Sequence, residues 1–168
     1  MTLGWGRDSP YVEYMFRWGL GYNLDWGFKY TFPGPLSVSG KWMFFDRDEW
    51  AMAVSLGFGA GYYFGGIEGL HLAWRDRTDV AFIQIPLAYH VSYDIFKQWT
   101  LYCSTKYFPV LLFGKGFRET THNMTFGLGT KIGEKNGVYL ETDYYTSFGS
   151  NLDGFIFAIG FFSTYSGI

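Results

Sequence analysis

The feature that most constrains this chain is a strict two-residue alternation, seen first in the segment 12–22, VEYMFRWGLGY. Every even position of this segment is large and apolar, whereas the odd positions include Glu13, Arg17 and two glycines. Neighbouring side chains of a β-strand point to opposite faces, so this spacing predicts a strand with one apolar and one polar face. The alternation returns along most of the chain, and no segment shows the 3.6-residue spacing of an amphipathic helix.

Turn signals divide the alternating segments into a series of short strands. The segments 12–22 and 26–32 form either a hairpin or one long bent strand, and Pro86 predicts a break because proline donates no ladder hydrogen bond. The segment 70–74 is either a short strand or part of a loop. We expect one domain over residues 1–168, with strands at 12–22, 26–32, 36–44, 50–62, 81–93, 99–107, 124–132, 138–144 and 155–165. The irregular stretches 64–79 and 113–123 are predicted to be loops.

Charged residues are confined to one face of these strands. The apolar faces carry none, whereas the opposite faces carry Glu13, Arg17, Asp25, Lys29, Lys41, Lys106, Lys131, Glu141 and Asp143. A lysine or arginine facing lipid near the middle of a bilayer costs about 2–4 kcal/mol, so a charge-free face is what lipid contact would select. We therefore predict that the apolar face meets lipid, with Phe16, Trp18, Phe28, Phe58, Phe126 and Phe157 among its members.

The composition supports this orientation. Aromatic residues make up 23% of the chain, a volume too large for the inside of a small barrel, while the polar faces are rich in Gly, Ala, Ser and Thr. Tyrosine and tryptophan gather near strand ends, as in the aromatic girdles of membrane barrels. Hydrocarbon tolerates no open sheet edge. The prediction is therefore an all-β, closed, antiparallel, up-and-down transmembrane barrel of eight or ten strands.

Three further observations limit the classes of protein. No run of about 20 apolar residues exists, which excludes a transmembrane helix. The net charge of −2 offers no electrostatic basis for nucleic-acid binding. The first ten residues, MTLGWGRDSP, lack the pattern of a secretory signal peptide, so we expect the numbering of an exported protein to describe a processed chain.

The strand pattern resembles small bacterial outer-membrane β-barrel proteins of the OmpA and OmpX type. The resemblance lies in YMFRWGLGYNLDWGFKY (14–30), in FIQIPLAYHVSY (82–93) followed by WTLYCSTKYF (99–108), and in the terminal GFIFAIGFFSTY (154–165). The last segment is similar to the aromatic strand read by the barrel-insertion machinery, although three residues follow Tyr165 here. The resemblance implies the bacterial outer membrane as the location and leaves the function open.

The charges on the polar faces are interpreted as a structural network inside the barrel. Buried charges are costly unless they are paired, and five basic residues stand against four acidic ones. The expected pairs join Glu13 to Arg17, and Glu141 or Asp143 to Lys131. The alternative is a small pore, a narrow polar conduit for small ions.

An enzymatic alternative depends on His90 and Ser92, which lie two residues apart on one strand face. Such a pair resembles the arrangement in lipid A deacylases, which are also outer-membrane barrels, and Glu141 or Asp143 could orient the histidine as a catalytic carboxylate. A polar interior role is the favoured interpretation of both residues. The histidines show no metal-ligand spacing, and the single Cys103 allows no intrachain disulfide, so neither a metal nor a cofactor is expected.

The predicted function is non-enzymatic: a structural or accessory protein of the outer membrane. Its expected partners are outer-membrane lipid or lipopolysaccharide and a membrane protein complex, contacted through the loops 64–79 and 113–123. A soluble lipocalin-like binder with the same strand period is a further alternative. It would stay monodisperse without detergent, whereas a membrane barrel would not.

Overall fold

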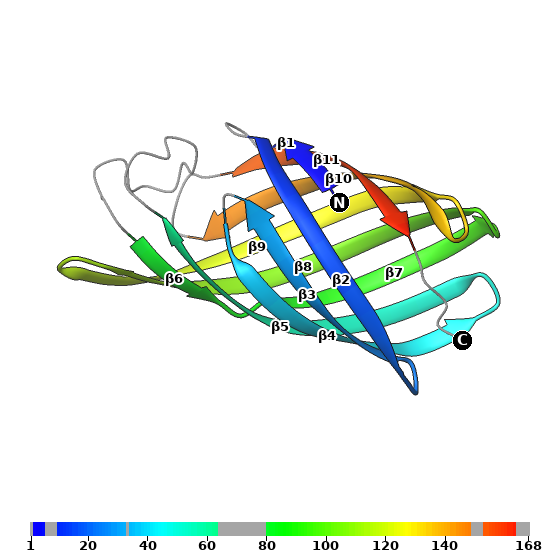
Figure 1. Cartoon of the computed structure of the whole chain (residues 1–168), viewed down its shortest axis with the longest axis horizontal. Helices are drawn as coiled ribbons and strands as arrows, with labels where there is room; N and C mark the ends of the chain where they lie inside the picture. Colours follow the sequence, from blue (N-terminus) through cyan, green and yellow to red (C-terminus); the bar gives the residue numbers. More distant parts are fainter. Residues whose placement is uncertain (1, 6–9, 33, 64–79, 149–152, 164–168) are drawn as a thin grey trace.

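The computed structural model describes residues 2–5, 10–32, 34–63, 80–148 and 153–163, and these residues are almost entirely β-strand (Figure 1). This part of the chain contains no helix long and apolar enough to cross a membrane. The strands are β1 (Thr2–Trp5), β2 (Pro10–Gly21), β3 (Leu24–Phe32), β4 (Leu36–Arg47), β5 (Trp50–Tyr63), β6 (Val80–Gln84), β7 (Leu87–Phe96), β8 (Trp99–Gly114), β9 (Phe117–Ile132), β10 (Asn136–Phe148) and β11 (Asp153–Ser163).

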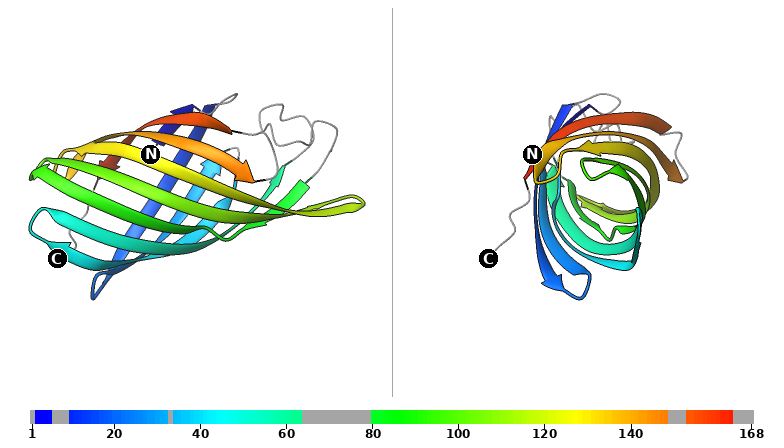
Figure 2. Two further views of the ribbon diagram at one scale, coloured as in Figure 1. Left: turned by 180° about the vertical axis from the view of Figure 1, so that it is seen from behind. Right: turned by 90° about the vertical axis from the view of Figure 1, so that its right-hand side faces the viewer.

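The strands close into an antiparallel ring (Figure 2). Apart from β6 and β7, which do not pair with each other, each strand pairs with the next along the chain, and β1 pairs with β11, so that every position in the ring has two neighbours. The strands β6 and β7 share one position, because both lie between β5 and β8. The ring therefore has ten positions, and the predicted up-and-down barrel is confirmed.

Two features of the ring bear on the strand count predicted from sequence. The tenth position is filled by β1, which no pattern indicated, while the segment 70–74 lies outside the described residues. The segments 12–22 and 26–32 form two strands, joined by a tight turn in which Tyr22 and Asn23 both have positive φ. Such values are typical of the turns that match the twist of a hairpin.

Pro86 interrupts the strand shared by β6 and β7, as its missing N–H predicts. The neighbouring strands bridge the break with backbone hydrogen bonds. The amide of Gly57 donates to the carbonyl of Pro86 at 2.8 Å, and the amide of Ile85 donates to the carbonyl of Pro109 at 3.2 Å. The ring thus remains closed at the break, and β6 and β7 keep one common register with β5 and with β8.

The two ends of the barrel differ. At one end, here called the short-turn end, tight turns join β2 to β3, β4 to β5, β7 to β8 and β9 to β10. At the opposite end, the loop end, the hairpin of β8 and β9 extends beyond the other strands (Figure 1). The predicted loop 113–123 is wrong, because Gly114 pairs with Phe117 and the two strands run on to Trp99 and Ile132 without a break. The predicted loop 64–79 lies outside the described residues.

Exposure alternates along most strands. The outward face consists largely of aromatic and aliphatic side chains, with Phe157 60% exposed, Phe16 57% and Phe58 49%. Trp18 and Phe126 are also exposed, and Phe28 is half-buried. A monomeric soluble protein rarely exposes apolar side chains over an entire surface. The only cluster of fully buried apolar residues in the described part of the chain joins Val80, Phe82 and Leu112 at the loop end.

Candidate functional site: the charged interior

The face opposite the apolar one carries charged side chains from β2, β3, β4, β8, β9 and β10. Lys106 of β8 lies within electrostatic range of Lys29 of β3 and Glu13 of β2. These strands stand on different sides of the ring, so their charges can interact only across its interior. The charges therefore project into the barrel.

Two ion pairs occupy the wall formed by β2 and β3. The Nζ of Lys29 lies 3.0 Å from Oε2 of Glu13, and the Arg17 guanidinium binds the carboxylate of Asp25, with its Nε donating at 3.0 Å. The expected pairing of Glu13 with Arg17 is wrong. Both residues come from one strand, and the register places a residue of β3 as the nearer partner of each.

Glycine on β3 gives Arg17 its path across the wall. The guanidinium Nη1 also donates to the hydroxyl of Ser39 on β4 at 3.5 Å, so the side chain crosses the backbone of β3 at Gly27. A Cβ atom at Gly27 would collide with the Arg17 side chain. Small residues on the polar faces thus leave the space that the long charged side chains occupy.

A second group of polar residues lies on the wall formed by β8, β9 and β10. The hydroxyl of Tyr102 donates to Oε2 of Glu141 at 3.1 Å, passing over Gly129 of the intervening strand. Asp143 lies two residues after Glu141 on β10, on the same face, and is within electrostatic range of Lys106 and Lys29. Lys106 therefore links the acidic residues of β10 to the ion pair of β2 and β3.

Lys131 does not pair with either acid of β10, contrary to the expectation from sequence. Its Nζ lies 4.4 Å from the centroid of the Phe162 ring on β11, in a cation–π contact. Lys41 of β4 lies within electrostatic range of Asp25, Arg17 and Lys131. All nine charged residues singled out from the sequence thus interact with a partner on the interior face.

The histidine of the enzymatic alternative has a different serine partner. His90 Nε2 lies 3.0 Å from the hydroxyl of Ser55 on β5, whereas among the described residues no hydrogen bond joins His90 to Ser92. Glu141 is engaged by Tyr102, and no carboxylate of the described residues is hydrogen-bonded to the His90 ring. The structure therefore does not assemble His90, Ser92 and Glu141 into a triad.

Ser55 was missed by the sequence analysis, because its contact depends on register. The pairing of β5 with β7 sets Ala53 opposite His90. Ser55 lies two residues after Ala53 on β5, and its side chain therefore points to the same face as that of His90. Both side chains are half-buried in the interior. The bond satisfies the imidazole inside the barrel, as polar groups in such a place require.

The loop end of the interior is filled by uncharged side chains. Asn123, which is only 1% exposed, accepts a hydrogen bond from the Tyr145 hydroxyl at 2.6 Å and donates to the carbonyl of Phe108 at 3.2 Å. The apolar cluster of Val80, Phe82 and Leu112 lies at the same end. Among the described residues, no group of His, Cys, Asp or Glu is arranged to hold a metal ion.

No family model matches this chain, and no curated protein matches it. Solved structures do. The structure of NanC porin superposes on this chain with a TM-score of 0.54 at 10% identity, and the match covers 98% of each chain. Ail, the attachment invasion locus protein of Yersinia pestis, gives 0.42 at 12% identity, covering 95% of this chain and 93% of its own. A KdgM porin gives 0.43 at 9% identity, covering 98% and 96%. The likeness to the NanC porin structure confirms the fold of an outer-membrane β-barrel.

Proposed function

We propose that this protein is a single-domain, integral protein of the bacterial outer membrane. The observation that carries the proposal is the distribution of side chains over a closed ring: apolar residues cover the outside and paired charges occupy the inside. In water this distribution would expose a whole apolar surface, and in a bilayer each face has a matching environment. The barrel fold shared with a porin supports the same compartment.

Aromatic residues near the short-turn end support a girdle at a membrane boundary. The rings of Trp18 and Trp26 stack with centroids 4.8 Å apart, and Trp50 and Tyr93 lie at the same separation. Trp99 follows the turn between β7 and β8. Membrane barrels of bacteria have short turns on the periplasmic side and longer loops outside. We therefore place the short-turn end in the periplasm and the loop end at the cell surface.

Within the membrane, the proposed role is structural and non-catalytic, with contacts made through the hairpin of β8 and β9. Each of these strands has 16 residues, whereas a tilted strand needs about 9–11 to cross a bilayer. The tip therefore stands outside the membrane and presents Lys115, Arg118 and Glu119, all of them exposed. Two cations at this position suit the phosphates of lipopolysaccharide or an acidic partner protein, and residues 64–79 stay a proposed second contact.

Native electrophoresis of membranes in mild detergent tests the accessory role. The wild type is expected to migrate as part of a larger assembly, and the variant K115E/R118E as the free barrel. The matched control R47E/K135E makes the same charge change at the short-turn end and should leave the assembly intact. A wild-type protein that migrates as the free barrel contradicts the accessory role.

A small pore is the second candidate, and one observation favours it. The side chains of the interior ion pairs keep 18% exposure at Glu13, 27% at Arg17, 29% at Lys29 and 33% at Asp25, so water reaches them. Planar-bilayer recording separates the two roles. A filled interior predicts no conductance above the lipid background. A pore predicts stable currents that change when Lys29→Glu or Lys41→Glu reverses an interior charge.

A further inference from the structure

The charges inside the barrel form two groups that differ in net charge. One group, here called the cationic group, surrounds Lys41 and consists of Arg17, Asp25, Lys41 and Lys131. The other surrounds Lys106 and consists of Glu13, Lys29, Lys106, Glu141 and Asp143. Three cations and one acid give the cationic group a net charge of +2, whereas two cations and three acids give the other group −1. The interior therefore has an excess of positive charge around Lys41.

The acid of the cationic group is already engaged. The Arg17 guanidinium binds the Asp25 carboxylate, and its Nη1 donates to the hydroxyl of Ser39 at 3.5 Å. The register sets Lys41 opposite Asp25 on β3 and opposite Ser55 on β5. Among the described residues, the Lys41 ammonium forms no ion pair, so its three donors have no acid within bonding distance.

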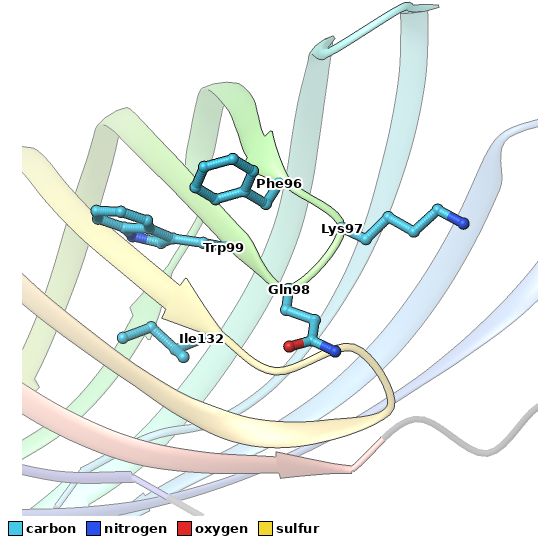
Figure 3. Close-up of a pocket in the computed structure, with 5 residues that line it drawn as sticks. All are labelled: Phe96, Lys97, Gln98, Trp99 and Ile132. Atoms are coloured by element: carbon cyan, nitrogen blue, oxygen red, sulfur yellow. The ribbon is translucent and has the colours of Figure 1, made fainter.

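Lys131 faces Lys41 from another side of the ring. The next residue, Ile132, lies on the outer face beside Trp99 at the short-turn end (Figure 3). Since successive side chains of a strand point to opposite faces, Lys131 points into the barrel. The strands β4 and β9 are not neighbours in the ring, so the interaction of Lys41 with Lys131 spans the interior. The space between them is thus bounded by cations on two walls.

Water reaches the cationic group. The side chains of Arg17 and Asp25 are 27% and 33% exposed, and Lys41 and Lys131 are half-buried. Like charges that are partly withdrawn from water repel one another, and an opposite charge placed between them offsets this cost. Among the described residues, Asp25 is the one acid within electrostatic range of Lys41. Further negative charge at this place has to come from solution.

We infer that the cationic group binds a small, doubly charged oxyanion inside the barrel, between Lys41 and Lys131. Two negative charges balance the net charge of the group, and oxygen atoms accept the hydrogen bonds that the two ammonium groups donate. The site lies inside the ring, so it rests neither on the membrane location nor on the accessory role. The bound anion would complete the charge network of the interior.

Equilibrium dialysis of the detergent-solubilised barrel against radiolabelled inorganic phosphate, in a chloride buffer of constant ionic strength, tests the inference. We expect saturable binding of one phosphate per barrel. Lys41→Gln should lower the affinity about tenfold or more, because a hydrogen bond to a charged group is lost. Lys29→Gln removes the same charge from the other interior group and should change the affinity less than twofold.

Three results would overturn the site. They are no saturable binding by the wild type, wild-type affinity in Lys41→Gln, and an equal loss in Lys41→Gln and Lys29→Gln, which would indicate general interior charge. A heat-dependent shift in electrophoretic migration verifies that each variant is a folded barrel. If Lys41→Gln does not fold, Lys131→Gln takes its place, with the same expected loss and the same contradicting results.

Discussion

At the scale of single residues, Lys29 lies between an acid that attracts it and a lysine that repels it. Glu13 pairs with Lys29, and Lys106 lies within electrostatic range of both. Replacing Glu13 by glutamine removes the acid that pairs with Lys29 and leaves the two lysines with Asp143 as an acid within electrostatic range of both. Replacing Lys29 by glutamine leaves Glu13 with the Thr31 hydroxyl, which donates to it at 3.4 Å, and with Lys106 within electrostatic range.

The two substitutions are therefore predicted to have unequal effects. Glu13→Gln should lower the free energy of unfolding by about 1.5–3 kcal/mol, the range for a hydrogen bond to a charged group, and Lys29→Gln by less than half as much. Urea titration of the protein in lipid vesicles measures both. Equal losses, or a larger loss for Lys29→Gln, would show that Lys106 does not share the acid.

The sequence alone did not predict which residues pair with each other inside the barrel. Alternation assigns a side chain to a face, and it placed all nine charged residues on one face. It does not fix the register between strands, and register makes Glu13 a partner of Lys29 and brings Ser55 to His90. Pairs predicted within one strand, such as Glu13 with Arg17, ignored the shorter distance across the sheet.

At the scale of elements, the two ladders of β9 differ in length within the described residues. The pairing of β9 with β10 ends at His122, whereas its pairing with β8 continues to Phe117. Among the residues that the structure describes, those at 117–121 therefore have ladder partners on β8 and none on β10.

Hydrogen exchange tests this difference along one strand. In detergent micelles, amides at 117–121 that point away from β8 should exchange faster than those of residues 124–131, which have ladder partners on both sides. Peptide-resolved mass spectrometry reports the two regions separately. Equal protection of the two regions in the purified protein would contradict this prediction and show that residues 117–121 have a second ladder partner.

This hairpin also shows where strand prediction failed. The segment 113–123 is polar and contains glycines, so it lacks the alternation that lipid contact imposes within the membrane. Outside the membrane the outward face no longer has to be apolar, and a hairpin can persist without that pattern.

In contrast, the break at Pro86 was predicted correctly, because the missing N–H acts in any environment.

At the scale of the whole molecule, the proposed membrane location depends on which face of the ring meets lipid. Composition and charge segregation were enough to predict the closed barrel, because hydrocarbon excludes both charged residues and open sheet edges. The number of ring positions was left at eight or ten, since β1 is too short to show a pattern. The function was not determined, because a barrel of this size supports several roles.

The single cysteine allows the most direct measurement of this assignment. Cys103 is exposed on the outer face, paired with Val91 and Leu128, and Ser104 follows it on the inner face. A nitroxide spin label at Cys103 of the reconstituted protein should collide more often with oxygen, which dissolves in lipid, than with a water-soluble nickel complex. A label at Ser104→Cys in a Cys103→Ser background should lose this preference for oxygen. The reverse result, with the label at 103 reached mainly by the nickel complex, would contradict the account.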